Sequence, residues 1–175
     1  MLVVSRKEKT LRKVAVGTVL FDQAKGAAVV TLVEEAGDRI LPIFIGLWEG
    51  MAIYRELNRA PAHRPMLHDI FFNVLHGLHT HLEKVVVDSL SDNTYYASLH
   101  LMHHDAPLIA DARPSDAIAL AVKFQAPIYV AEDILATAGK RVEEALTEET
   151  REATGREDVQ AWLENIRPED FADPQ

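Results

Sequence analysis

The chain has 175 residues, a 48% apolar composition, no cysteine and a formal net charge of −9. This length predicts one compact domain, and the apolar content is enough for a core that needs no disulfide or metal. The lack of cysteine excludes disulfide bonds, thiol nucleophiles and cysteine zinc sites. The longest apolar run, 40–48, is far shorter than the roughly 20 residues of a membrane helix, and the run 2–4 is too short for a signal peptide. We therefore expect a cytoplasmic protein with no membrane segment.

The negative charge lies mostly at the C-terminal end. Residues 132–175 contain 13 acidic residues against 5 Lys or Arg, whereas residues 1–131 contain 14 against 13. A nearly neutral main body neither excludes nor indicates a phosphate ligand. The first 13 residues contain five Lys or Arg against one Glu, which predicts a solvated basic segment. We expect a basic N-terminal segment (1–13), a core domain (14–138), and an acidic linker with a C-terminal helix (139–175).

The first half of the core is predicted to hold three strands and two helices. β-Branched runs separated by glycine predict strands over 14–21, 27–33 and 39–45, arranged as an antiparallel meander. A helix over 48–58 follows. A second helix, over 67–78, has its apolar residues at helical spacing.

The second half of the core is predicted to hold four strands and two helices, and a third helix is expected in the C-terminal part. The strands are expected over 82–90, 94–102, 107–111 and 126–130, and the helices over 114–124, 132–138 and 158–166. From Ala117 to Phe124 only Lys123 is polar, so the helix over 114–124 is apolar on nearly every side. Such a helix belongs in the middle of a fold.

Two of the predicted helices begin on an Arg-Pro pair and have an acidic residue in their first turns. The polar residues at these starts are Arg64, His68 and Asp69 at the first, and Asp111, Arg113, Ser115 and Asp116 at the second. Proline suits the first helical position, because an N–H there would have no partner within the helix. Capping of a core helix is one explanation for Ser115 and Asp116. The alternative is an anion site, because helix N-termini and arginine forks bind phosphate.

If the two helix starts meet, they offer what phosphodiester hydrolysis requires. The expected roles are catalysis by Asp116, Asp111 and His68, phosphate binding by Arg64, Arg113 and Ser115, and binding of Mg²⁺ or Mn²⁺ by Asp69 and Asp116. Carboxylates commonly hold such a cation, which activates water. Nothing in the sequence places the two starts together. Nucleophile-elbow, P-loop and dinucleotide motifs are absent, which argues against a nucleotide-dependent kinase or dehydrogenase.

Two groups of histidines form a further pattern. The groups are His76, His79 and His81, and His100, His103 and His104. One helical turn separates His76 from His79, so these two could share a metal. With no cysteine or carboxylate in register, solvated histidines are the favoured interpretation.

Several stretches, in order and with consistent spacing, resemble the bifunctional nuclease (BFN) domain family. They are 39–46 followed by Glu49, Arg64-Pro65 with His68-Asp69, 111–121, and 127–130, while 168–171 resembles the ending of bacterial members. The resemblance spans about 14–130. It implies an α+β domain with a mixed, largely antiparallel sheet packed with helices, assembly as a homo-oligomer, and nuclease activity on DNA or RNA. Where the family has threonine in its Arg-Pro-x-Thr-His-Asp motif, this chain has Leu67 and lacks the hydroxyl.

Two functions remain open at this point. The first is a metal-assisted phosphodiesterase acting on nucleic acid, which the resemblance favours. The second is a non-catalytic anion-binding or regulatory module, whose Arg-Pro helix starts hold a small anion or a carboxylate of a partner protein. The near-neutral body and the lack of an aromatic and basic stripe favour the second.

Overall fold

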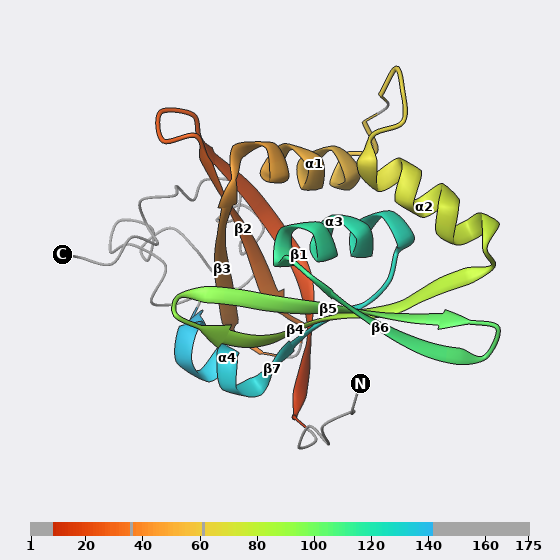
Figure 1. The fold of residues 1–175 in the computed structure, drawn as a ribbon. Coiled ribbons are helices and arrows are strands. Elements are labelled where there is room, and N and C mark those ends of the chain that lie inside the picture. Colours follow the sequence, from red (N-terminus) through yellow and green to blue (C-terminus); the bar gives the residue numbers. More distant parts are fainter. Residues whose placement is uncertain (1–8, 36, 61, 142–175) are drawn as a thin grey trace.

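A computed structural model describes residues 9–35, 37–60 and 62–141, which form one sheet and four helices (Figure 1). The strands are β1 (Leu11–Asp22), β2 (Ala27–Glu34), β3 (Arg39–Gly46), β4 (Thr80–Ser91), β5 (Thr94–His103), β6 (Ala106–Ala112), β7 (Ile128–Ala131) and β8 (Lys140–Arg141). The helices are α1 (Leu47–Leu57), α2 (Leu67–Gly77), α3 (Pro114–Phe124) and α4 (Glu132–Ala138). The predicted helix over 158–166 and most of the predicted linker lie outside the described residues.

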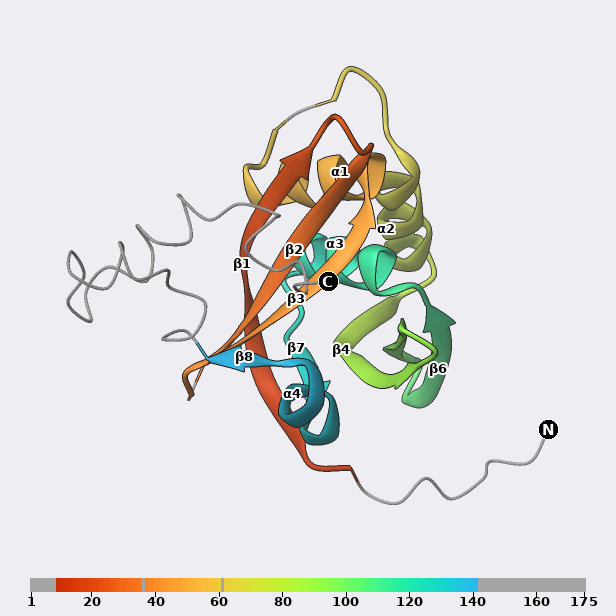
Figure 2. The same ribbon diagram turned by 90° about the vertical axis from the view of Figure 1, so that its left-hand side faces the viewer.

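The eight strands are ordered β6-β5-β4-β7-β1-β2-β3-β8 in a mixed sheet. The pairs β1–β2 and β2–β3 are antiparallel, which confirms the predicted meander. Strands β4 and β7 pair in parallel, with Val86 opposite Tyr129, because the chain returns to the sheet through α3. The predicted α+β fold with a largely antiparallel sheet is therefore confirmed. Figure 2 shows the sheet as two arms, one of β1 to β3 and one of β4 to β6, with α3 between them.

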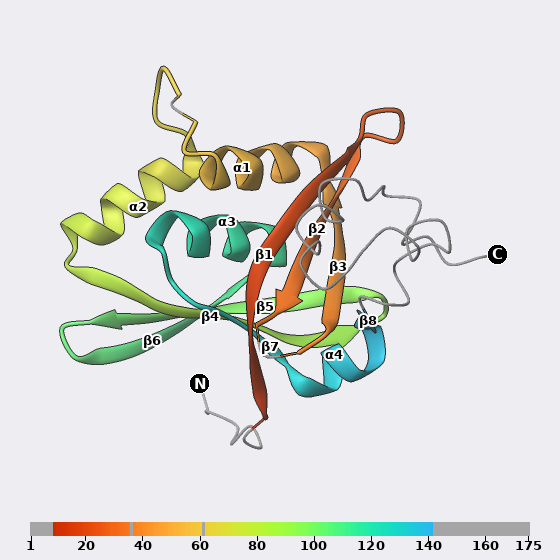
Figure 3. The same ribbon diagram turned by 180° about the vertical axis from the view of Figure 1, so that it is seen from behind.

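Helix α3 is the centre of the core. Its residues 117–121 are each 5% exposed or less, which confirms the central position predicted from its composition. The helix packs against α1, α2, β4 and β5. Figures 1 and 3 show α1, α2 and α3 together on one side of the sheet, while α4 lies apart from them near β7. The polar residues at the start of α3 therefore project from a helix whose middle is fixed in the core.

Helix α1 lies close to the sheet because Gly50 has no side chain. A Cβ atom at Gly50 would lie 2.5 Å from the Cβ of Ala28 and 3.2 Å from Cε1 of Phe21.

Helices α1 and α3 run in the same direction, since Glu49 contacts Arg113 at their starts and Glu56 contacts Lys123 at their ends. The N-termini of both helices therefore lie at the same end of the fold.

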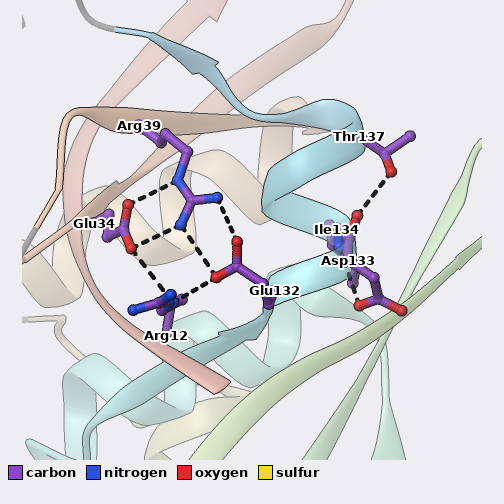
Figure 4. A network of polar contacts seen from close by, with 7 residues as sticks. All are labelled: Arg12, Glu34, Arg39, Glu132, Asp133, Ile134 and Thr137. Atoms are coloured by element: carbon purple, nitrogen blue, oxygen red, sulfur yellow. Dashed lines mark hydrogen bonds and ion pairs between the residues drawn. The ribbon is translucent and has the colours of Figure 1, made fainter. Parts of the chain in front are cut away.

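An ion-pair ring joins β1, β2, β3 and α4 (Figure 4). Arg39 bonds Glu34 and Glu132, each at 2.8 Å, and Arg12 bonds Glu132 at 2.5 Å. The ring places Arg12 in the fold, so β1 begins at Leu11 and not at the expected residue 14. At the other end, β8 pairs Lys140 and Arg141 with β3, so the fold extends over the first three residues of the predicted linker.

The ring predicts a dependence of stability on acid. Hydrogen bonds from Arg39, and then from Arg12, lower the pKa of Glu132 from its ordinary 4.5 to about 2. A carboxyl whose pKa is lower in the folded state stabilises the fold above pH 4.5, and this contribution is lost as the pH falls towards 2. We expect the melting temperature of Glu132→Gln to lie below that of wild type at pH 7, and the two to converge near pH 2. A gap that is the same at pH 7 and pH 2 would contradict the assigned role of Glu132.

Candidate functional site

The starts of α1, α2 and α3 are linked by one polar cluster. Nη1 of Arg113 lies 3.0 Å from Oε1 of Glu49, and Nε of Arg113 lies 2.8 Å from Oδ2 of Asp116. The other carboxylate oxygen of Asp116 lies 3.6 Å from Nε2 of His68. We call these four residues the helix-start cluster. The structure thus brings together His68 and Asp116, which belong to the two different Arg-Pro helix starts.

The local sequence at the start of α3 explains this geometry. Arg113 is the N-cap residue, with extended backbone, and Pro114 follows at the first helical position. No side chain caps the first turn of α3, nor that of α1 after Gly46. The charge of Asp116 in the first turn is favourable there because of the helix dipole. Its carboxylate contacts Arg113 and His68 and does not cap the helix.

His68 is the most unusual member of the cluster. Its side chain is 17% exposed, and within the described ranges its Nε2 is the one buried side-chain nitrogen or oxygen without a hydrogen bond. Because 3.6 Å is beyond hydrogen-bond range, a small approach towards Asp116 would supply the missing bond. A buried imidazole nitrogen facing a carboxylate is the arrangement that fixes a histidine for proton transfer.

Arg113 supplies the positive charge of the cluster. Hydrogen bonds to Asp116, and then to Glu49, raise its pKa, so the guanidinium stays charged. The side chain is nevertheless 65% exposed. It uses three of its five N–H groups in these bonds, which leaves two for a ligand.

A pocket of about 330 Å³ adjoins the cluster. Its lining includes Gly46 and Glu49 around the start of α1, Arg113 and Ser115 at the start of α3, and residues 93–95 of the β4–β5 hairpin. The positive end of the α3 dipole and the charge of Arg113 make this pocket suitable for an anion, whereas the first N–H of α1, that of Leu47, donates to the carbonyl of Gly26. Glu49 belongs to the residues that carry the family resemblance, but no functional role is predicted for it from the sequence. The one sequence feature that could have indicated this site is that Glu49 lies in the first turn of a helix that directly follows a strand.

Asp69 and Arg64 lie outside the cluster. The carboxylate of Asp69 pairs with Lys123 at 2.5 Å and accepts a hydrogen bond from the backbone N–H of Met66. Lys123, and then that N–H, lower the pKa of Asp69. Arg64 borders a separate groove together with Asp69. Met66 is the N-cap of α2, so Asp69 stabilises the start of this helix although Leu67 brings no hydroxyl.

The residues predicted to hold a metal do not meet as a pair of free ligands. Asp116 contacts Arg113 and His68, whereas Asp69 contacts Lys123. Over the described ranges, no group of three or more His, Asp or Glu side chains is arranged to hold a metal ion. Asp69 and Asp116, the two predicted ligands, therefore do not fit a resident cation as they are arranged here. Binding of Mg²⁺ or Mn²⁺ by this protein stays a prediction.

Asp111 is separated from the cluster by the alternation of strand β6. It is exposed and lies opposite Ser98 in the pairing of β5 with β6. Its neighbours Ala110 and Ala112 pack against the core, so the side chain of Asp111 is directed to the other face of the sheet.

The histidine groups are divided by the structure. The ring of His103 lies 4.3 Å from that of His104, which in turn lies 6.4 Å from that of His79. His76 stacks instead on Phe72. Like the carboxylates, these histidines belong to no metal-binding group within the described part of the chain.

Comparison with known proteins assigns the family. The model of the bifunctional nuclease domain matches residues 30–143, a range that includes the helix-start cluster. An uncharacterized protein of Mycobacterium tuberculosis is 34% identical over 162 residues, which cover 91% of this chain and 97% of that protein. The chain belongs to the bifunctional nuclease domain family, and the predicted resemblance is confirmed.

More distant relatives carry the nuclease name. Bifunctional nuclease 1 of Oryza sativa subsp. japonica is 25% identical over 126 residues, which cover 70% of this chain and 38% of the rice protein. Bifunctional nuclease 2 of the same plant is 24% identical over 112 residues, which cover 62% of this chain and 34% of the rice protein.

No helix within the described ranges is both long and apolar enough to span a membrane.

Proposed function

We propose that this protein hydrolyses phosphodiester bonds of DNA or RNA at the helix-start cluster. Membership of the family and the named rice nucleases support a nuclease-like function. The observation that carries the proposal is the convergence of His68, Asp116 and Arg113 from two helix starts. A base, the acid that orients it and a phosphate-binding fork are the groups that the reaction needs.

Three of the four residues of the helix-start cluster have a chemical role in this proposal, while Glu49 holds Arg113 in place. The two remaining N–H groups of Arg113 and the first turn of α3 bind the phosphate and stabilise the charge of the transition state. Asp116 orients His68 through Nε2, which leaves Nδ1 to accept a proton from water. The water oxygen then bonds to phosphorus, the bond to one ester oxygen breaks, and the leaving oxygen takes a proton from solvent. No step is assigned to a metal, because Glu49 and Asp116 are paired with Arg113, and Asp69 is paired with Lys123.

A non-catalytic anion-binding module is the second candidate function. The nearly neutral main body favours it, because residues 1–131 contain 14 acidic residues against 13 Lys or Arg, whereas proteins that bind nucleic acid usually present a basic surface. Self-association also remains a prediction. The exposed apolar stripe of α2, formed by Leu67, Ile70, Val74 and Leu78, is a surface that it would bury.

Turnover by matched variants tests the proposed function. Asp116→Asn keeps the shape of the side chain but removes the charge that orients His68, so we expect kcat to fall by about 100-fold or more while the protein remains folded. The substrates are fluorescently quenched single-stranded DNA and RNA, each with Mg²⁺, with Mn²⁺ and with EDTA. The exposed Asp38 lies in a turn remote from the cluster, so Asp38→Asn, purified in parallel, is the control. Equal turnover by all three proteins would show contaminating nuclease and would favour the anion-binding module.

A further inference from the structure

Three arginines without a carboxylate partner line one groove. Arg55 lies in the last turn of α1, Arg59 follows that helix, and Arg64 precedes α2. All three border a groove of about 740 Å³ between the ends of α1 and α3 and the start of α2. Within the described ranges none of them forms an ion pair, although Arg55 donates a hydrogen bond to the sulfur of Met66 and its charge contributes to the lowered pKa of Asp69.

The fourth cation of the groove is already neutralised. Lys123 is 16% exposed and pairs with Asp69 at 2.5 Å and Glu56 at 3.2 Å. Burial opposes its charge, but the hydrogen bonds to Asp69 and Glu56 outweigh burial and raise its pKa. Lys123 is therefore shared by two carboxylates, and Arg55 also acts on one of them, because its charge lowers the pKa of Asp69. The groove still has four cationic side chains against two carboxylates, an excess of two positive charges in a chain whose net charge is −9.

The polar groups of the groove suit a phosphate backbone more than a base. Asn73 and Gln125 add hydrogen-bonding side chains to the lining. The aromatic ring of Phe72 is occupied, because it packs on Phe124 with centroids 4.7 Å apart, stacks with His76, and lies under Lys123. Base stacking on an open aromatic face, which many single-strand binders use, is therefore not provided by Phe72.

We infer that this arginine groove binds the sugar–phosphate backbone of a single nucleic-acid strand without reading base sequence. The inference rests on the proposed function, because the groove and the helix-start cluster lie on the two sides of the first turn of α2. Asp69 faces the groove and the adjacent His68 faces Asp116. A strand held by the three arginines continues past this turn to the site of hydrolysis. Arginine forks hold phosphates through paired N–H groups, and each contact releases a counterion.

Binding and small-substrate turnover separate the groove from the chemistry. The variant Arg55→Gln/Arg59→Gln/Arg64→Gln removes three charges and keeps polar side chains. We expect its affinity for a fluorescein-labelled 12-nucleotide single strand, measured by anisotropy in EDTA, to fall at least tenfold. The slope of log K against log[NaCl] should become shallower by about 2, since each phosphate contact contributes roughly 0.7 for single strands. Turnover of bis(p-nitrophenyl) phosphate, which is too small to span the groove, should stay unchanged.

The control removes the same charge elsewhere. Lys13, Lys25 and Arg141 lie outside the groove, so Lys13→Gln/Lys25→Gln/Arg141→Gln should bind the strand within about twofold of wild type. Equal losses in the two triple variants, or no binding by wild type at 50 mM NaCl, would overturn the inference. Competition by poly-glutamate as strong as that by poly(dT) would also overturn it, since the groove would then be a general anion site. If wild type binds the strand through the groove but turns over no diester, the proposed function fails while the groove assignment stands.

Discussion

Replacement of Ala121 by Asp is expected to leave little or no folded protein. Ala121 is 1% exposed and lies within the run of buried residues at the centre of α3. A carboxylate at this position would be buried without a partner, which costs several kcal/mol. Because a domain of this kind is stable by only about 5–15 kcal/mol, we expect a loss of more than about 4 kcal/mol. The soluble fraction after expression and the urea midpoint measure this loss.

Two further variants make the test specific to the core. Ala121→Val adds apolar volume without charge and should remain folded, with stability lowered by about 1–3 kcal/mol. Ala24 lies exposed in the turn between β1 and β2, so Ala24→Asp should leave the melting temperature within a few degrees of wild type. A soluble Ala121→Asp protein with the melting temperature of wild type would mean that α3 is not the centre of the fold.

Replacement of His68 by Gln is expected to lower kcat by about 10²–10⁴, with KM little changed. Glutamine can still donate a hydrogen bond towards Asp116, but it cannot accept a proton from water. The measurement is steady-state turnover of quenched single-stranded DNA and RNA, together with the melting temperature of each protein. His81 is exposed on β4, away from the cluster, so His81→Gln is the matched control and should keep the kcat of wild type. A His68→Gln protein with unchanged kcat would remove His68 from the proposed mechanism.

Local patterns in the sequence were sufficient to predict most of the fold. Pro114 marks the start of α3, and the unbroken apolar run after it marks a buried helix; both features appear in the structure. Glycine punctuation between β-branched runs likewise predicts the meander of β1 to β3. The start of β1 was misplaced because Arg12 looks solvated in sequence, whereas its partner Glu132 is 120 residues away.

The candidate site could be predicted only in part, because its contacts depend on packing between helices. His68 and Asp69 are adjacent, yet they face different partners on α3, Asp116 and Lys123. No local pattern shows that α2 crosses α3 in a way that separates them. The position of Asp111 is different, since its place between two alanines of a strand already suggests a side chain directed away from the core.

The most direct measurement of the central claim is a double-mutant cycle on His68 and Asp116. The four proteins are wild type, His68→Gln, Asp116→Asn and the double variant, purified in parallel and compared by kcat on one labelled single strand. Residues that act as one catalytic unit give strongly non-additive losses. We predict that the double variant loses no more activity than His68→Gln alone, because the catalytic role proposed for Asp116 is to orient His68. Losses that multiply in the double variant, or activity that persists in all four proteins, would contradict a shared catalytic centre at the starts of α2 and α3.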